Sequence, residues 1–413
     1  MPAPGYRLDL LEAAFALPGG EVVRRLAGPA VHLVGGTVRD LLLGRRPKEI
    51  DLVVELPLSE LLAGLPAKSV RYERFETATV YLDGAQIDLA RSRRERYPRG
   101  GALPEVEPAP LAEDLRRRDF TVNALALTTG GPDRGLLHAV PHGLEDLEGR
   151  LLRVLHPASF EEDPTRLFRL ARYRARLGFE VEAGTAAWAQ EAVRAGALET
   201  VSCRRRTQEL VRCLRDEEPI AQIERLADLG LLAAERLAEP DRRPLEAALQ
   251  LLAETVGEGF RVERLCALAL LADAPLLGER PQFWERSGLE REELKVLKAA
   301  PRLSEVEEAL RSPLPPAALY QRLRQLAPEA IAWAAVRAGE EGRQRAAAYL
   351  RRLRAAQLAI SGKDLLAAGA KPGPKVGAAL EEVRALLLEG EVGPDRAEQL
   401  QAALAAIEGR GGR

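Results

Sequence analysis

Two acidic residues separated by one position, Glu49 and Asp51, lie in an apolar stretch that reads as a strand. Side chains alternate between the faces of a strand, so both carboxylates project from one face while Ile50 and Leu52 point to the other, buried face. Unpaired carboxylates this close repel each other, and a hard divalent cation such as magnesium relieves the repulsion with the oxygen ligands that it prefers. The alternative for so short a pattern is an ordinary solvated strand face.

A glycine turn precedes this strand. The apolar run Val31 to Val34 is too short for a helix, and Gly35-Gly36 lets the backbone turn sharply into a helix. The first amides of a helix carry unpaired N–H groups, and Arg39 adds a planar donor fork that suits phosphate oxygens. A glycine pair alone indicates only a turn. A phosphate cradle followed by paired carboxylates, however, is what metal-assisted phosphoryl or nucleotidyl transfer requires.

In this order and spacing, the two elements resemble the G-G-x-V-R-D and D-x-D signature of the nucleotidyltransferase head shared by class II CCA-adding enzymes and bacterial poly(A) polymerases. The resemblance implies magnesium on Glu49 and Asp51. It also implies an α/β head with a small mixed sheet of the polymerase-beta type, followed by an all-α neck, body and tail. The first carboxylate of the family is normally Asp, and here it is Glu49. Because glutamate keeps the charge and adds one methylene, we expect metal binding to survive.

Asp88 lies in a further strand pattern, Gln86 to Ala90, where it alternates with apolar neighbours. On a strand next to Asp51 it would face the same side, and a third carboxylate there can help to deprotonate an attacking hydroxyl. The resemblance supports this role, because an acidic residue commonly stands five positions before an arginine here, matched by Asp88 and Arg93. A solvated strand acid or an ion pair is the competing interpretation.

Residues 91–110 are rich in Arg, Pro and Gly without periodicity, which predicts a mobile loop. The position matches the flexible loop of CCA-adding enzymes, which is shortened in relatives that add only C. The segment here has close to full length, which favours addition of the whole CCA sequence.

A polar cluster, LRRRDFTVNA, follows at residues 115–124. By itself it indicates a helix start, with Asp119 as the N-cap and solvated arginines before it. It also closely resembles the family's second motif, R-R-D-F-T-I-N-A. That match assigns Arg118 to the nucleotide phosphates, Asp119 to the ribose, and Asn123 to support of the local geometry.

Residues 141–156 and 201–214 resemble the family's third motif and its weaker fifth motif. The third is carried by Asp146, Leu147, Leu152 and Arg153. In such enzymes this element couples head to neck, so the match predicts either a hinge or a structural ion pair.

Residues 161–179, EEDPTRLFRLARYRARLGF, read as a helix with arginines at every third position. The apolar residues fall on the other side, so we expect a basic ridge that faces away from the core. The stretch resembles the family's fourth motif, E-D-P-x-R-x-L-R-x-x-R. Carried over, Asp163 and Arg166 read the incoming base, while Arg169 and Arg172 hold phosphates. A carboxylate beside a guanidinium suits cytosine and adenine, which present an amino donor beside a ring-nitrogen acceptor, and rejects uracil and guanine.

The last pattern, residues 360–377, reads as helix, glycine hairpin, helix. Lys363, Lys371 and Lys375 with the turn amides at Gly373 can make sequence-independent phosphate contacts. An ordinary corner between helices is the alternative. Family tails with S-G-K-D-L and P-G-P-x-x-G are similar, and they grip the tRNA elbow.

The chain has 413 residues and a net charge of −2, which excludes a uniformly basic nucleic-acid binder but permits local basic patches. We expect four parts: a catalytic head at 1–140, a base-recognising neck at 141–215, a body at 216–312 and a tRNA-binding tail at 313–413. Three cysteines without C-x-x-C spacing predict neither a disulfide framework nor a zinc site. No signal peptide and no apolar run of membrane length is found, so we expect a soluble cytoplasmic protein without a membrane or an obligate protein partner.

These patterns together predict template-independent addition of CCA to the 3′ end of tRNA, from CTP and ATP with magnesium. An A-adding enzyme, a CC-adding enzyme and a poly(A) polymerase share the motifs and are the enzymatic alternatives. The non-enzymatic alternative is a tRNA-binding protein whose head has lost its chemistry through Glu49.

Overall fold

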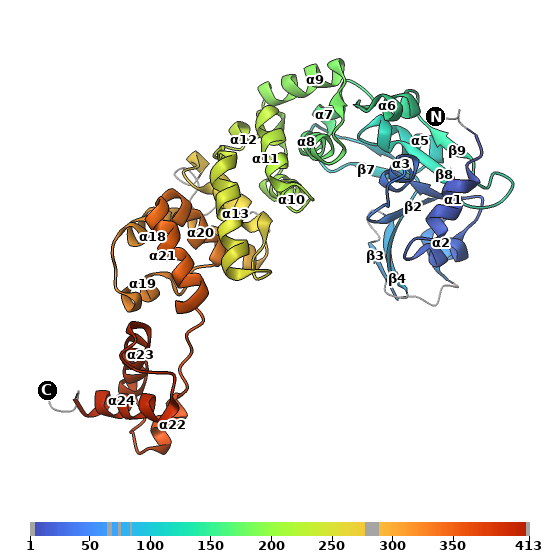
Figure 1. Cartoon of the computed structure of the whole chain (residues 1–413). Helices are drawn as coiled ribbons and strands as arrows, with labels where there is room; N and C mark the ends of the chain where they lie inside the picture. Colours follow the sequence, from blue (N-terminus) through green and yellow to red (C-terminus); the bar gives the residue numbers. More distant parts are fainter. Residues whose placement is uncertain (1–4, 64–67, 73–75, 83–84, 277–288, 410–413) are drawn as a thin grey trace. The chain divides into compact units, whose positions relative to one another are not determined.

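The computed structural model describes residues 5–63, 68–72, 76–82, 85–276 and 289–409 (Figure 1). It divides into two compact units, Met1–Ala234 and Glu235–Arg413. The predicted division into head, neck, body and tail is finer than this and stays a prediction. Among the described residues, no helix has the length and apolar character needed to cross a membrane.

A seven-stranded mixed sheet dominates the N-terminal part of the first unit, in the order β3-β4-β5-β2-β1-β8-β9. The pair β2 and β5 is parallel and the other neighbours are antiparallel. This confirms the predicted α/β head with a mixed sheet. The strands are β1 (Val31–Val34), β2 (Ile50–Val54), β3 (Lys68–Tyr72), β4 (Thr77–Leu82), β5 (Ala85–Arg91), β8 (Leu125–Thr128) and β9 (Leu137–Ala139).

Short helices surround this sheet and connect its strands: α1 (Leu8–Phe15), α2 (Gly20–Leu26), α3 (Gly36–Leu42), α4 (Leu58–Leu62), α5 (Leu111–Arg116) and α6 (Gly143–Gly149). Helix α3 begins at the glycine turn and contacts β1 and β8, as the sequence pattern predicts. Helix α5 packs on the sheet through Leu111 and Leu115, which share a buried cluster with Val34 and Val53. The strand that carries Asp51 and the glycine turn are therefore held by a rigid apolar core.

The segment 91–110 is irregular only in part, which corrects the sequence prediction for its two ends. It forms an antiparallel ribbon of β6 (Arg93–Arg96) and β7 (Glu105–Pro108). Opposite charges pair across the two strands, with Arg94 Nη2 2.7 Å from Glu107 Oε2. A cross-strand charge pair can stabilise a ribbon that has no alternating apolar pattern. Hydrophobic periodicity therefore does not predict this ribbon.

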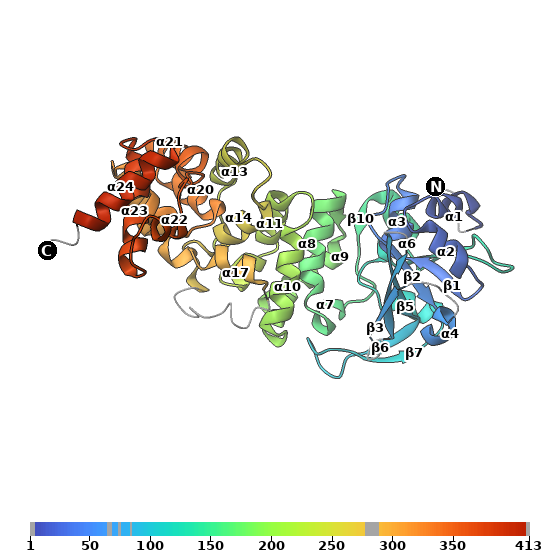
Figure 2. The same cartoon turned by 90° about the horizontal axis from the view of Figure 1, so that it is seen from below.

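Helices follow the sheet in the first unit. They are α7 (Ser159–Glu162), α8 (Arg166–Leu177), α9 (Ala183–Arg194), α10 (Cys203–Leu214), α11 (Pro219–Asp228) and α12 (Leu231–Ala234), with a small parallel pair of strands, β10 (Leu151–Leu152) and β11 (Glu180–Val181). Helix α8 packs against α10 and α11, and the three lie side by side in Figure 2. The first turns of α8 and α10 thereby come to the same region of the unit.

The described part of the second unit is helical. Its elements are α13 (Arg242–Val256), α14 (Val262–Leu271), α17 (Arg291–Leu297), α18 (Leu303–Arg311), α19 (Pro316–Leu323), α20 (Pro328–Arg337), α21 (Glu340–Ala348), a π-helical turn (Tyr349–Leu353), α22 (Gly362–Ala367), α23 (Pro374–Glu389) and α24 (Arg396–Gly409). The apolar helix α20 is buried among α13, α14 and α18. Helices α22, α23 and α24 enclose a separate small core that includes Leu365, Val383 and Ala403.

Candidate active site

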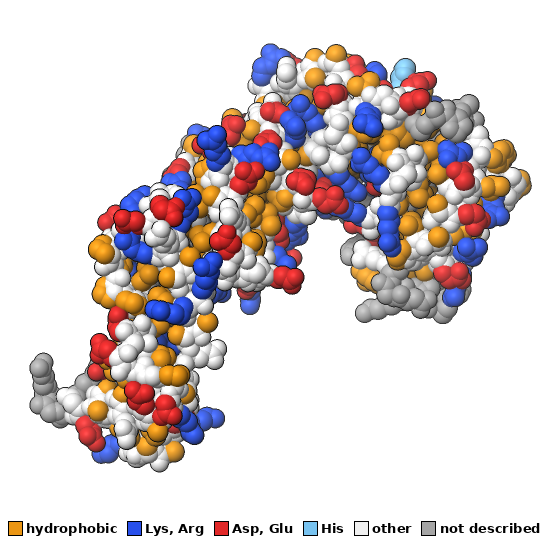
Figure 3. All heavy atoms as spheres, viewed as in Figure 1, with side chains coloured by type: hydrophobic (Ala, Val, Ile, Leu, Met, Phe, Trp, Pro, Cys, Tyr) orange, Lys and Arg blue, Asp and Glu red, His pale blue; other side chains and the backbone are white. Residues whose placement is uncertain are grey.

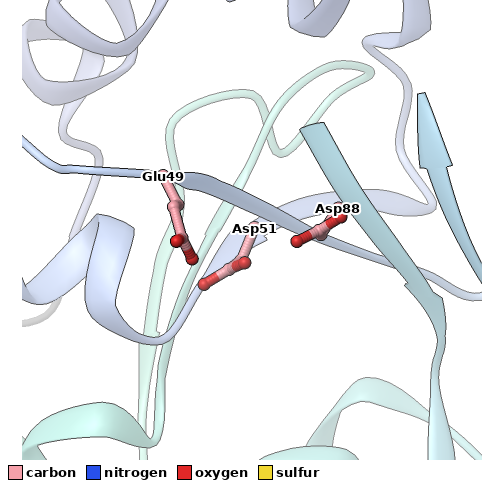
Figure 4. Close-up of side chains that lie close together, drawn as sticks. All are labelled: Glu49, Asp51 and Asp88. Atoms are coloured by element: carbon pink, nitrogen blue, oxygen red, sulfur yellow. The ribbon is translucent and has the colours of Figure 1, made fainter. Parts of the chain in front are cut away.

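Three carboxylates come together at one end of the central strands. Asp51 on β2 is paired in register with Asp88 on β5, and Glu49 lies just before β2. One oxygen from each lies within 4.8 Å of the others, and Figure 4 shows Asp51 between Glu49 and Asp88. The Thr37 hydroxyl of α3 fixes this edge, because it donates to the Glu49 carbonyl (3.2 Å) and accepts from the Asp51 amide (3.0 Å).

The electrostatics of this cluster suit a cation. Burial, reinforced by the neighbouring Glu49 carboxylate, raises the pKa of Asp51 to about 6. A divalent cation would relieve both the repulsion and part of the desolvation cost. The donor set consists of oxygen atoms alone, which is the preference of magnesium, and Glu49 reaches the cluster despite replacing the usual aspartate.

Gly35 allows an arginine to lie directly against the turn. Gly35 has φ +63°, and a Cβ built there would lie 2.9 Å from Arg118 Nη1. Arg118 is held in place by the fully buried Asp114, whose Oδ2 accepts from its Nη2 at 2.9 Å. Burial acts to raise the pKa of Asp114, but Arg118 and Arg117 hold it below its ordinary value. Sequence reasoning missed Asp114, although an acid three and four positions before two arginines is a helical pairing signal.

Arg39 is held by acceptors within the protein, and its predicted role as a phosphate-binding fork stays a prediction. It is 1% exposed. Its Nε and Nη2 donate to Asp40 Oδ1 (2.8 and 2.7 Å), and its Nη1 donates to Asn123 Oδ1 (2.6 Å). A buried guanidinium must have acceptors, and here the protein provides them, so Arg39 braces the glycine turn from inside.

Asp119 connects the second motif to α8. The buried carboxylate accepts from Asn123 Nδ2 (3.1 Å) and from Arg169 Nε (2.7 Å). Burial acts to raise the pKa of Asp119, but Arg169 and Asn123 outweigh it and lower the value to about 2. Asn123 therefore bridges Arg39 and Asp119, which agrees with a supporting role.

A cavity of about 430 Å³, called the first cavity, lies between the sheet and helices α8 and α10. Most of the residues predicted for nucleotide binding line it: Gly35, Gly36, Arg118, Asp119, Asn123, Asp163, Arg166 and Arg169. Asp51, predicted for catalysis and metal binding, lines it too. Arg172 lines an adjoining cavity of about 620 Å³, the second cavity, together with Glu49 and Lys48. The two cavities share Asp51 and Gly36, so both open onto the carboxylate cluster.

The arginines of α8 do not form a ridge facing away from the core, which corrects that expectation. Arg166 is 4% exposed and donates to Ser159 Oγ (2.6 Å) and to the Arg117 carbonyl (2.9 Å). Arg169 turns towards Asp119, as described above. Helix α8 has protein on both sides, so its polar face lines a cavity instead of the outer surface.

Asp163 is held by a residue that the sequence analysis did not select. Arg205 on α10 donates through Nη2 to Asp163 Oδ1 (3.0 Å) and through Nη1 to the carbonyl of Gly101 in the β6–β7 connection (2.8 Å). Tyr97 of the same ribbon also lines the first cavity. The resemblance of residues 201–214 to the fifth motif was the available signal for Arg205.

Two residues of the third motif, Asp146 and Arg153, form an ion pair. Arg153 Nε lies 2.9 Å from Asp146 Oδ2, and Thr121 Oγ1 donates to the same oxygen at 2.7 Å. This agrees with the structural ion pair; the predicted hinge stays a prediction.

The predicted tRNA-binding residues lie in the second unit, outside the cavities. Lys363 is in α22, Lys375 is in the first turn of α23, and Lys371 and Gly373 lie in the connection between them. All four are exposed. On the face seen in Figure 3, basic and acidic side chains alternate over both units, as expected for a chain with nearly balanced charge.

Comparisons with known proteins agree with this site. Residues 31–153 match the Poly A polymerase head domain. The chain is 36% identical to the CC-adding tRNA nucleotidyltransferase of Deinococcus radiodurans over 89% of this chain and 88% of that protein. It is 35% identical to the A-adding tRNA nucleotidyltransferase of Geobacter sulfurreducens over 87% of this chain, but spans only 43% of that longer protein.

Two solved structures extend the likeness to the whole chain. The Thermotoga maritima CCA-adding enzyme complexed with tRNA_CCA aligns with a TM-score of 0.71 and 28% identity, over 98% of this chain and all of that one. A CCA-adding enzyme complexed with CTP aligns with a TM-score of 0.74 and 28% identity over the full length of both chains. The match to the D. radiodurans protein, which covers nearly the whole of both sequences, carries the assignment: the chain belongs to the tRNA nucleotidyltransferase family.

Proposed function

We propose that this protein adds CCA to the 3′ end of tRNA without a nucleic-acid template, using CTP, ATP and magnesium. The observation that carries the proposal is the position of Asp51, which belongs to the carboxylate cluster with Glu49 and Asp88 and also lines the first cavity. Asp163 and Arg166 line the same cavity. The first set suits metal-assisted transfer of a nucleotide, and the second suits recognition of cytosine and adenine.

In the proposed reaction, the terminal 3′ hydroxyl of the RNA loses its proton and its oxygen attacks the α-phosphorus of the nucleotide. A new phosphodiester bond forms, the bond between the α-phosphorus and the bridging oxygen breaks, and pyrophosphate leaves. Asp88 is the proposed acceptor of this proton, which then passes to solvent. Magnesium held by Glu49 and Asp51 would supply charge stabilisation for the attacking and leaving oxygens.

Other residues of the chain orient the nucleotide. Arg118, next to the glycine turn, and Arg169 and Arg172, on α8, are the proposed phosphate ligands, and Asp119 is the proposed ribose contact. The exposed Lys363, Lys371 and Lys375 with Gly373 are the proposed contacts to the tRNA elbow. We expect the protein to act in the cytoplasm, where tRNA and nucleoside triphosphates meet.

A second candidate is addition of only part of the CCA sequence, either A alone or CC alone. The relative in G. sulfurreducens is an A-adding enzyme, whereas the one in D. radiodurans adds CC, so relatives of similar identity differ in specificity. A tRNA-binding protein without activity is disfavoured, because the Glu49 carboxylate stays within the cluster.

The test uses purified protein with magnesium and tRNA that ends at the discriminator base. CTP alone, ATP alone and both are supplied, and the products are sized at nucleotide resolution. We expect growth by two nucleotides with CTP and by three with both. Addition of one A only to tRNA that already ends in CC would establish the A-adding candidate instead.

A further inference from the structure

The strand segment that carries the first two carboxylates extends past the end of its neighbour β1. The register between β1 and β2 ends at Leu33 and Leu52. After Val34 the chain turns away from the sheet through the glycine pair and enters α3. The backbone of Glu49 and Asp51 therefore lies beyond the last of these strand pairs and needs other partners on this edge.

Thr37, in the first turn of α3, takes the place of the missing strand neighbour. Its hydroxyl donates to the Glu49 carbonyl at 3.2 Å and accepts from the Asp51 amide at 3.0 Å. These two backbone groups face the same edge of the strand because they are two residues apart, so one hydroxyl serves both. The β-branched side chain is 1% exposed, and packing therefore holds the hydroxyl in place.

This anchor sets the starting points of two side chains that lie in one cluster. Each contributes an oxygen to the group within 4.8 Å, although the Glu49 side chain is exposed and Asp51 is only partly buried. An exposed side chain receives little guidance from packing, so the backbone that carries Glu49 matters for where its carboxylate lies. A shift of the backbone between Glu49 and Asp51 would change the distance between the two carboxylates.

The choice of cation depends on this distance. Mg²⁺ requires nearly ideal octahedral geometry with oxygen ligands at about 2.0–2.1 Å, whereas Ca²⁺ accepts irregular arrangements at about 2.3–2.6 Å. A rigid spacing can therefore favour the smaller ion. Loss of that rigidity should remove more affinity for Mg²⁺ than for Ca²⁺.

We propose that Thr37 is a positioning residue that fixes the spacing between the Glu49 and Asp51 carboxylates and thereby favours Mg²⁺ over larger cations. The inference rests on the proposed nucleotidyl transfer, in which these carboxylates hold magnesium. It adds the residue that adapts the site to the size of the ion. The Thr37 hydroxyl acts through the backbone of the two ligands and is not itself a ligand.

The test compares Thr37→Val, which keeps the side-chain shape, with Thr37→Ser, which keeps the hydroxyl. Cation affinity is measured from the rise in Tm of the full chain with magnesium chloride or calcium chloride, without nucleotide or RNA. We expect T37V to raise the Kd for Mg²⁺ by about tenfold or more and the Kd for Ca²⁺ by less than about threefold. T37S should stay within about twofold of the wild type for both ions, because its hydroxyl can make the same two bonds.

Thr129 provides a matched control at the other end of β1. It is also 1% exposed, and its hydroxyl donates to the Val31 carbonyl (2.8 Å) and accepts from the Gly28 amide (3.2 Å). Thr129→Val therefore removes the same two kinds of hydrogen bond away from the carboxylate cluster. We expect T129V to lower the Tm about as much as T37V does and to leave the affinity for both cations unchanged.

Several results would overturn the inference: no rise of the wild-type Tm with magnesium chloride, wild-type Mg²⁺ affinity in T37V, or an equal loss of Mg²⁺ and Ca²⁺ affinity. A loss of Mg²⁺ affinity in T37S or T129V as large as in T37V would do the same. If T37V does not fold, Thr37→Ala is measured in the same way, with the same expected losses. Failure of the proposed function is distinct, because the wild type would then bind Mg²⁺ but transfer no nucleotide.

Discussion

Among single residues, Asp51 joins the parts of the site, because its carboxylate lines both the first and the second cavity. Its pKa of about 6, raised by burial and then by Glu49, means that ionising it opposes folding when no cation is bound. Because the pKa of Asp51 is higher in the folded state than in the unfolded state, the fold loses stability progressively as pH rises from about 4 to about 6. The whole loss of folding free energy is present above pH 6. That cost has an upper limit of roughly 3 kcal/mol.

The change Asp51→Asn keeps the shape of the side chain and removes its charge. In metal-free buffer at pH 7.5 we expect D51N to raise the Tm by about 2–6 °C, with the gain disappearing near pH 4. Magnesium should raise the Tm of the wild type but have little effect on the variant. Thermal unfolding with and without magnesium measures both effects, and a lower Tm for metal-free D51N would contradict the cation-site interpretation.

Gly35 is the second residue whose substitution should have a large effect. An alanine there would have to adopt φ +63° and would press its Cβ against Arg118 Nη1. We expect Gly35→Ala to weaken CTP binding by about tenfold or more, as measured by equilibrium titration.

The control for Gly35→Ala is Gly149→Ala, at the exposed end of α6, where a Cβ would meet nothing closer than 3.8 Å. It should leave CTP binding unchanged. Tight CTP binding by G35A would show that Arg118 does not need to lie against the glycine turn.

At the scale of elements, the strand–turn–helix–strand unit from Val31 to Val54 could be predicted from sequence, because apolar runs and glycines report local backbone structure. The pairing of Asp51 with Asp88 was also predictable, since alternation along two neighbouring strands places their carboxylates on one face. The β6–β7 ribbon could not be predicted from periodicity, because its stabilising pairs are charges brought together only by the hairpin. The burial of Arg39 and Arg166 depends on acceptors distant in sequence, which are Asn123 for Arg39 and the Arg117 carbonyl for Arg166, so a local pattern did not report it.

Arg205 contacts both the ribbon at Gly101 and Asp163, the proposed base-reading residue. Glutamine at this position is shorter and uncharged, so Asp163 would lose its orientation. We expect Arg205→Gln to lower the ratio of kcat/KM for CTP over UTP by about tenfold. The comparison is Arg204→Gln, an exposed neighbour on α10, and an equal loss of discrimination in both variants would remove the specific role of Arg205.

At the scale of the whole molecule, nucleotide chemistry and the proposed tRNA grip lie in different compact units. The first unit contains the carboxylate cluster and its cavities, and the second contains the exposed lysines beside the α22–α23 connection. A net charge of −2 means that long-range attraction to RNA is weak, so local cations must provide it. Substitutions in the first unit should therefore impair nucleotide transfer without weakening tRNA binding, and substitutions of the lysines should do the reverse.

Replacing Lys363, Lys371 and Lys375 together with glutamine should raise the KM for tRNA by about tenfold and reduce the salt dependence of tRNA binding. The KM for CTP should stay unchanged, because these residues lie outside the described cavities. The matched control replaces three cations of α17 in the same unit, Arg291, Lys295 and Lys298, with glutamine. A similar loss of tRNA affinity in the control would mean that general charge, not this turn, binds the RNA.

The central claim is that the carboxylate cluster transfers a nucleotide to the 3′ end of RNA. The most direct measurement follows label from α-labelled CTP into tRNA that lacks its CCA end, using the wild type and D51N with and without magnesium. We expect the wild type to incorporate label only with a divalent cation, and D51N to lose at least about a hundredfold of that activity while still binding CTP. Incorporation by D51N at the wild-type rate, or by the wild type in the presence of a chelator, would contradict it.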